Sequence, residues 1–285
     1  MTCLNIKDYL DVVKPKQTFL LMITFCVSFL VASNLKIDFI KFTLSFVSVL
    51  LAVMGTTALN MKLDSDIDAL MPRTRDRPVP SGRISPLHCT FYGAFLYLTG
   101  LIISIFTAFQ LSIVILLGLL FYIVIYTLIL KRRTPYSIIL GGFAGAMPSL
   151  AGWVAVNGFS LAGFIISAIV LLWIPSHIWY LSIHYYDDYE KAGIPMYPLV
   201  AGMRKASWAI VLATGFMLLA ESILYLISSL NLVFLVVSQI VTLNFLFKSA
   251  RFAVSPKRVK AKRMYKLASI TLGLIYLAMV LDILI

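Results

Sequence analysis

Nine long stretches of mainly apolar residues follow one another along the chain, and short polar segments separate them. Each stretch has about 18–24 residues, which is enough for an α-helix to cross the hydrocarbon core of a membrane. Strands of a membrane barrel would instead alternate apolar and polar residues. The pattern therefore predicts nine transmembrane helices, within 17–35, 42–61, 87–108, 110–130, 136–157, 160–183, 207–228, 230–247 and 267–285.

The composition of the 285-residue chain supports this interpretation, because 61% of the residues are hydrophobic and 13% are charged. The charged fraction is about half that of a typical soluble domain, and the mean hydropathy is +0.96. A soluble protein cannot keep so many apolar side chains away from water. We therefore exclude a soluble enzyme, a disulfide scaffold and a disordered chain, and we expect an all-α, polytopic membrane protein.

The basic residues indicate how the chain is oriented in the membrane. If the N-terminus lies inside, all but two of the 24 lysines and arginines fall on the inner side, and the exceptions are Lys36 and Lys41. Loops rich in Lys and Arg face the cytoplasm. We therefore expect a protein of the cell membrane with its N-terminus and acidic loops in the cytoplasm and its C-terminus outside. The net charge of +12 is spread over several loops, which argues against a nucleic-acid partner.

Two long polar segments, 62–86 and 185–206, follow the second and the sixth predicted helix and lie on the same side. Because four helices separate them, we expect residues 1–285 to form a single transmembrane domain of two similar four-helix halves plus a ninth helix. The first predicted helix could be mistaken for a signal peptide, but its apolar stretch is long for that role. The charge distribution also requires this helix, and we expect it to be retained.

The first polar segment begins with oxygen-bearing side chains at helical spacing. If the second predicted helix continues through it, Asn60, Asp64 and Asp68 lie on one helical face. Carboxylates at that spacing repel one another unless a cation lies between them, and Mg²⁺ prefers oxygen ligands that it shares with substrate phosphates. We expect a magnesium site there, with Asp66 facing solvent. The alternative is a solvated helix end with ordinary carboxylates.

Four arginines follow these aspartates directly, at positions 73, 75, 77 and 83. A guanidinium group binds phosphate oxygens through a fixed fork of donors. Proline and glycine residues between the arginines indicate a shaped loop. The pattern favours binding of a diphosphate over the alternative, which is the excess of basic residues common to all cytoplasmic loops.

The second polar segment contains another acidic pair, Asp187 and Asp188. His177, His184 and Asp188 share one helical face by their spacing. An acidic cluster that faces the first would hold a second Mg²⁺ or the other side of the same diphosphate. Such a pair of clusters would neutralise the charge that develops when an allylic diphosphate departs. For His177 the spacing leaves two interpretations open, a side chain buried between helices and an ionisable group that faces a cavity.

Several stretches together resemble the haem O synthase family, also called the protohaem IX farnesyltransferase family, within the UbiA-type intramembrane prenyltransferases. The stretch 60–85, NMKLDSDIDALMPRTRDRPVPSGRIS, is similar to the first motif of that family, and 188–200, DYEKAGIPMYPLV, is similar to the second. Further matches are GGFAGAMPSLAGW at 141–153, the segment 175–179, Lys14-Pro15 and Lys131-Arg132. His177 belongs to the family pattern, whereas His184 does not. The GIPM sequence is peculiar to the haem branch.

The resemblance implies a nine-helix UbiA-type fold around a central cavity that is open to lipid. It also implies Mg²⁺-dependent transfer of a farnesyl group from farnesyl diphosphate to a vinyl group of haem B, with addition of water, to make haem O for terminal oxidases. Further expected partners are the lipid bilayer and haem A synthase or oxidase assembly proteins. The implied catalytic residues are Asp64, Asp68 and Asp188, which together with Asn60 are also the implied metal ligands. The implied diphosphate ligands are Asn60, Arg75, Arg77, Lys131 and Arg132. The haem-binding candidates are His177 and Trp179.

Two other functions stay open at the level of sequence. An enzyme of the same class would transfer a prenyl chain to a quinone precursor or a glyceryl lipid, and the GIPM sequence argues against it. A transporter or haem carrier would place acidic residues near the bilayer midplane. Here the acidic residues lie at the inner edge, in polar loops with arginines, which favours an enzyme.

Overall fold

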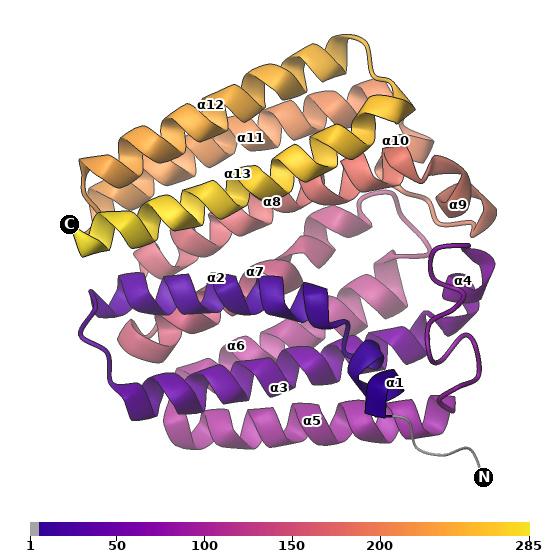
Figure 1. Cartoon of the computed structure of the whole chain (residues 1–285), viewed down its shortest axis with the longest axis horizontal. Helices are drawn as coiled ribbons and strands as arrows, with labels where there is room; N and C mark the ends of the chain where they lie inside the picture. The colour runs from indigo at the N-terminus through magenta and orange to yellow at the C-terminus, as the bar shows by residue number, and fades with distance from the viewer. Residues whose placement is uncertain (1–5) are drawn as a thin grey trace.

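The computed structural model describes residues 6–285, and helices account for most of this length (Figure 1). Nine helices in these residues are long and apolar enough to cross a membrane, as the sequence predicts. They are α2 (Pro15–Ser33), α3 (Phe39–Leu63), α5 (Pro86–Thr107), α6 (Phe109–Leu119) with its continuation η1 (Leu120–Leu130), α7 (Ser137–Asn157), α8 (Leu161–His184), α11 (Met203–Ile227), α12 (Leu232–Val254) and α13 (Arg258–Leu284).

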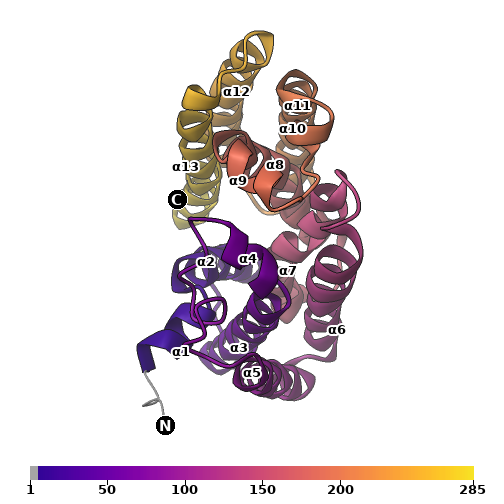
Figure 2. The same ribbon diagram turned by 90° about the vertical axis from the view of Figure 1, so that its right-hand side faces the viewer.

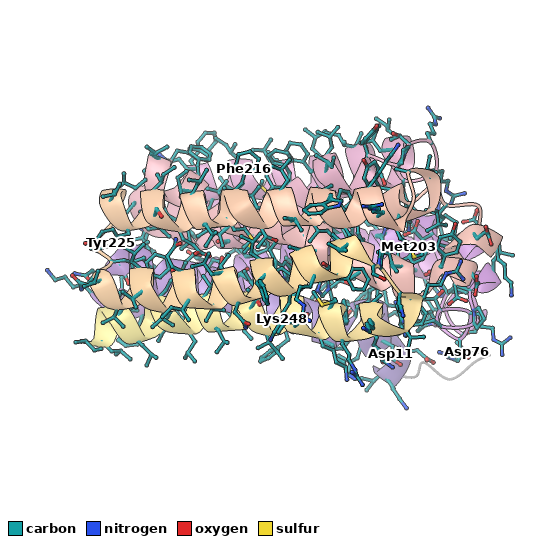
Figure 3. All side chains as sticks on the ribbon, turned by 90° about the horizontal axis from the view of Figure 1, so that it is seen from above. Asp11, Asp76, Met203, Phe216, Tyr225 and Lys248 are labelled. Carbon is teal, nitrogen blue, oxygen red and sulfur yellow. The ribbon has the colours of Figure 1, made fainter. Side chains whose placement is uncertain are left out.

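Four short helices lie at one end of this bundle, which is the end predicted to face the cytoplasm (Figures 1 and 2). They are α1 (Ile6–Val12), α4 (Ser65–Leu70), α9 (Tyr186–Lys191) and α10 (Tyr197–Val200). The C-terminal end of α13 lies at the opposite end of the bundle (Figure 1). Figure 3 shows the same polarity, because Asp11, Asp76 and Met203 lie at one end and Tyr225 lies near the other.

The long helices form two groups that meet along α7, α8 and α13. In the first group α3 packs along α5 and α2 packs along α7, and in the second α11 packs along α8 and α12. Close approach in the first group depends on glycine: a methyl group on Gly152 would collide with the backbone carbonyl of Phe25 in α2. Glycine thus permits close packing of α7 against α2. The likeness of two four-helix halves stays a prediction.

Side chains on the outer surface of the bundle are apolar, which is the arrangement of a protein that faces lipid. On α5 the exposed side chains recur every three or four residues, as expected for one face of a helix. These exposed residues are Phe91, Phe95, Leu98, Ile102, Ile105 and Phe106. The polar and charged loops are confined to the two ends of the bundle, so the chain is a multi-pass membrane protein.

The C-terminal half of the fourth span is a π-helix, η1, which the apolar pattern did not predict. Its backbone bonds join residues five apart, and the amide of Lys131 donates to the carbonyl oxygen of Tyr126 at 2.8 Å. The hydroxyl of Thr127 donates to the carbonyl oxygen of Tyr122 at 2.7 Å. A π-helix widens the helical turn and is frequently found at functional sites. Here η1 carries Thr127 and Lys131 toward α3.

A cavity of about 110 Å³ lies among α2, α3, α5, α6, η1 and α7. Its lining therefore comes from helices of the first helix group. Most of its wall is apolar, and the polar exceptions are Gln17, Thr56, Thr57, Tyr97 and Tyr122. Gln17 and Thr57 each lie three residues from a residue of the polar site described next, so the cavity begins beside that site.

Candidate functional site

The oxygen-bearing residues Asn60, Asp64 and Asp68 lie at the C-terminal end of α3, at the junction with α4, and in α4. A break at Asp64 separates these helices, but the amides of Asp64 and Asp68 still donate to the carbonyl oxygens four residues earlier, at 2.9 and 2.8 Å. The three residues therefore keep the helical spacing that the sequence predicts. They are 3%, 4% and 5% exposed, respectively.

Asn60 is the centre of a hydrogen-bond network that joins three segments. Its amide nitrogen donates to Asp64 Oδ2 at 2.7 Å and to Thr127 Oγ1 at 3.1 Å. Its amide oxygen accepts a hydrogen bond from Lys14 Nζ at 3.0 Å. Because the lysine can only donate, the orientation of the Asn60 amide follows from its partners.

Each of the two buried carboxylates is paired with a basic side chain. Lys131 Nζ lies 2.6 Å from Asp64 Oδ2, and Arg77 Nη1 lies 2.6 Å from Asp68 Oδ2. The second oxygen of Asp64, Oδ1, is buried and has no hydrogen-bond partner among the described residues. Two of the predicted diphosphate ligands, Arg77 and Lys131, thus lie within the same cluster as the predicted metal ligands.

Lys14 belongs to this cluster although it was not among the residues assigned to the site from the sequence. Its backbone has a φ of 47°, a left-handed conformation that costs about 1 kcal/mol or more for a residue with a side chain. Burial lowers the pKa of its ammonium group to about 7, and Arg77 contributes to the shift while Asp68 and Asp64 oppose it. The available signal was a lysine directly before a proline at the inner end of the first span. Thr127 was missed because a threonine in an apolar span gives no signal.

Two other predicted diphosphate ligands, Arg75 and Arg132, are exposed at the edge of the cluster. Arg132 donates to both carboxylate oxygens of Asp66 at 2.7 Å, and this hydrogen bonding lowers the pKa of Asp66. The Asp66 side chain is 62% exposed, as expected from its position between the three inward-facing residues. The participation of Arg75 and Arg132 in substrate binding stays a prediction.

The second acidic segment lies in α9, beside the loop that follows α4. The guanidinium of Arg73 lies 5.1 Å from the ring centroid of Tyr185, and burial raises the pKa of the Tyr189 hydroxyl, while Arg73 and Arg77 oppose this shift. Asp187 is exposed and forms an ion pair with Arg258 at 2.8 Å. Asp188 is half-buried, and its carboxylate makes no hydrogen bond or ion pair with another described residue. The chain bends at Tyr185 between α8 and α9, so Asp188 does not continue the helical face of His177.

The two haem-binding candidates, His177 and Trp179, lie in different surroundings on α8. The His177 ring lies between Trp173 and Tyr265, with centroid distances of 4.4 and 4.6 Å, and its Nδ1 is 3.2 Å from Ser269 Oγ. Trp179 is buried in a hydrophobic cluster. Residues two apart on a helix point in nearly opposite directions, so the two side chains do not line one surface. Their contact with haem stays a prediction.

Within residues 6–285 no group of three or more His, Cys, Asp or Glu side chains is close enough to hold a metal ion. The chemistry of Asn60, Asp64 and Asp68 nevertheless fits Mg²⁺, which binds amide and carboxylate oxygens. The unpartnered Oδ1 of Asp64 supports the fit, because a buried charged oxygen without a partner is costly. The cluster as a whole combines metal-binding oxygens with basic groups that bind phosphate.

Comparison with known proteins agrees with this arrangement. Residues 21–270 match the UbiA prenyltransferase family. A protein of Archaeoglobus fulgidus named protoheme IX farnesyltransferase is 56% identical over 98% of this chain and 99% of its own length.

Two solved structures share the fold. The structure of a digeranylgeranylglyceryl phosphate synthase has a TM-score of 0.84 at 22% identity, over 98% of both chains. A UbiA homologue from Archaeoglobus fulgidus bound to GPP and Mg²⁺ has a TM-score of 0.69 at 12% identity, over 96% of this chain and 99% of that one. The family match covers most of the chain, and the chain belongs to the UbiA prenyltransferase family.

Proposed function

We propose that the protein transfers the farnesyl group of farnesyl diphosphate to a vinyl group of haem B, with addition of water, and so makes haem O and diphosphate. One observation carries this proposal. A buried pair of carboxylates, each held by a basic side chain, lies at the inner end of an apolar cavity within a chain 56% identical to a protein named protoheme IX farnesyltransferase.

The cluster is suited to the departure of an allylic diphosphate. Lys131, Arg77 and Lys14 present ammonium and guanidinium groups that would bind the oxygens of the leaving group as negative charge develops on them. Mg²⁺, held by Asn60, Asp64, Asp68 and Asp188, would neutralise the diphosphate by Lewis-acid polarisation. The solved structure of a UbiA homologue bound to GPP and Mg²⁺ supports this assignment. Arg75 and Arg132 would bind phosphate oxygens from the solvent side.

The cavity among α2, α3, α5, α6, η1 and α7 would receive the apolar tail of the donor. Its polar residues Gln17, Thr57 and Tyr122 lie toward the carboxylate cluster, and Val49, Val114 and Ala151 line its wall elsewhere. A prenyl tail bound in this cavity is removed from contact with water, while the diphosphate stays at the end of the bundle that holds the carboxylate cluster. The Tyr122 and Tyr126 rings are stacked with centroids 6.3 Å apart, and their faces would stabilise the allylic cation.

The proposal places the reaction at the cytoplasmic face of the cell membrane, because the cluster lies at the Lys- and Arg-rich end of the bundle. The C-terminus of α13 would then lie outside. Haem B would approach from the side of α8, where His177 retains Nε2 as a free ligand while Nδ1 lies against Ser269. Water that captures the second cation would come from the same polar end.

The proposal is tested by incubating the purified protein with Mg²⁺, farnesyl diphosphate and one acceptor at a time, followed by mass spectrometry of the products. The acceptors are haem B, 4-hydroxybenzoate and geranylgeranylglyceryl phosphate. We expect a gain of one farnesyl group plus one water on haem B alone. Prenylation of either other acceptor, with haem B unchanged, would replace the proposed function with quinone or lipid prenylation. Transport of haem B into proteoliposomes without prenylation would indicate a carrier.

A further inference from the structure

Three basic side chains bind the three oxygen-bearing residues of the buried cluster one to one. Lys14 is bound to Asn60 Oδ1, Lys131 to Asp64 Oδ2 and Arg77 to Asp68 Oδ2, at 3.0, 2.6 and 2.6 Å. The three cations come from three different segments, namely the chain before α2, the end of η1 and the loop after α4. Three of the four predicted metal ligands thus each have one oxygen already bound to one of these cations, and the fourth, Asp188, does not.

Lys14 is held in this position by its backbone as well as its side chain. Its amide donates to the carbonyl oxygen of Asp11 at 3.1 Å, and its carbonyl oxygen accepts from Gln17 and Thr18 at 2.9 and 3.1 Å. These bonds maintain the left-handed conformation of Lys14, which is unusual for a residue with a side chain. The chain therefore bends at the point where the lysine side chain enters the cluster.

The net charge of the paired residues in the cluster favours binding of an anion. Among the six paired residues, three basic groups face two carboxylates and Asn60 contributes no charge, so these six have a net charge of about +1 with Lys14 in its ammonium form. Asp188 is not paired with any of them. A divalent cation alone is repelled by this arrangement and must also displace tethered competitors from its ligands. A diphosphate is attracted by it, and each displaced basic group becomes free to bind a phosphate oxygen.

We propose that Lys14, with Lys131 and Arg77, acts as a tethered cation that holds the metal-binding oxygens until a diphosphate arrives, so that metal binding depends on the diphosphate. Asn60 then turns its amide oxygen from Lys14 to the metal, and Lys14 turns to the phosphate. Lys14 is in this account a positioning residue before binding and a phosphate ligand afterwards. Of the two carboxylate oxygens of Asp64, Oδ2 is bound to Lys131. The other, Oδ1, is buried and has no hydrogen-bond partner among the described residues. The inference rests on the proposed use of a prenyl diphosphate, and it does not depend on the acceptor.

The test compares the wild type with Lys14→Met, Lys14→Arg and the control Lys16→Met, whose side chain is exposed two residues away. Mn²⁺ binding without diphosphate is measured from the electron paramagnetic resonance signal of free Mn²⁺. Binding of labelled farnesyl diphosphate at saturating Mn²⁺ is measured by equilibrium dialysis. Elution from size exclusion and the melting temperature in detergent report folding.

We expect Lys14→Met to bind Mn²⁺ alone about tenfold more tightly than the wild type, a difference of about 1.4 kcal/mol, and to bind farnesyl diphosphate about tenfold more weakly. Lys14→Arg and Lys16→Met should resemble the wild type in both. Changes of opposite sign distinguish this role from a structural one, because a damaged site would bind both ligands more weakly. Unchanged or weaker Mn²⁺ binding by Lys14→Met would overturn the inference.

Two further outcomes separate the inference from the proposed function. If the shifts occur as expected but haem B is not farnesylated, the inference stands and the proposed acceptor is wrong. If Lys14→Met does not fold, Lys131→Met is measured in its place, since it removes a second cation of the same set and must also bind Mn²⁺ alone more tightly. A wild-type protein that binds Mn²⁺ equally well with and without an excess of farnesyl diphosphate would refute the dependence itself.

Discussion

At the scale of single residues, the sequence predicts the acidic half of the site better than the basic half. Asn60, Asp64 and Asp68 are related by local helical spacing, and they lie together as predicted. Lys14 and Thr127 reach Asn60 across 46 and 67 residues of chain. No local spacing relates these positions, because their proximity depends on how α2 and η1 pack against α3. Arg132 illustrates the same limit, since its partner Asp66 was predicted only to face solvent.

The arginines after α4 provide a prediction at this scale. Arg77→Met should lower the free energy of unfolding by about 3 kcal/mol, because it leaves the buried carboxylate of Asp68 without its partner. Arg75→Met removes an exposed side chain, and its effect on stability should stay within about 0.5 kcal/mol. The measurement is thermal unfolding of each variant in detergent without substrate. Equal destabilisation by the two substitutions would show that the ion pair of Arg77 with Asp68 does not stabilise the fold.

At the scale of elements, hydrophobic stretches predict the transmembrane helices to within a few residues, except where polar residues extend a helix. The ninth predicted helix, 267–285, begins at Arg258 in the structure, because its first turns carry basic residues that a hydrophobic stretch does not include. The π-helix η1 was also not predicted, since hydrophobicity does not distinguish backbone bonds four apart from bonds five apart. The short helices α4 and α9 have too few residues for a periodic pattern.

The contact between α2 and α7 provides a prediction for elements. Gly152→Ala should destabilise the protein by about 1–3 kcal/mol, because the added methyl group meets the backbone of Phe25 and the two helices must move apart. Gly215→Ala is the matched control, since a methyl group there meets no atom of the described residues within 4 Å. Both variants are compared by thermal unfolding in the same detergent. Because alanine favours a helix more than glycine does, Gly215→Ala should not lower stability. A loss of stability in Gly215→Ala as large as that in Gly152→Ala would show that the contact with Phe25 is not the cause.

At the scale of the whole molecule, composition predicts the membrane class and the distribution of charge predicts the orientation. The helices that line the cavity could not be predicted from the sequence, because they depend on which helices pack together. Residues that are distant in sequence, such as those of α2, α3 and η1, meet only in the assembled bundle. The site is therefore a property of the packed first helix group, with loops added at its inner end.

The predicted orientation is tested by cysteine labelling of intact cells and of inverted membranes, in a variant that lacks Cys3, Cys26 and Cys89. Ser255→Cys lies between α12 and α13 at the basic end, and Ser229→Cys lies between α11 and α12 at the other end. A membrane-impermeant maleimide should label Ser229→Cys in cells and Ser255→Cys only in inverted membranes. The reverse pattern would place the carboxylate cluster outside the cell and contradict the proposed location.

The most direct test of the central claim measures haem O formation by the wild type, Asp64→Asn and Asp66→Asn under identical conditions. The two substitutions each remove one negative charge from the same short segment, but Asp64 is buried in the cluster and Asp66 faces solvent. Mass spectrometry follows conversion of haem B in the presence of Mg²⁺ and farnesyl diphosphate. We expect conversion by the wild type and Asp66→Asn, and a loss of at least about 100-fold for Asp64→Asn with its folding intact. Haem O formation by Asp64→Asn at the wild-type rate would contradict the account.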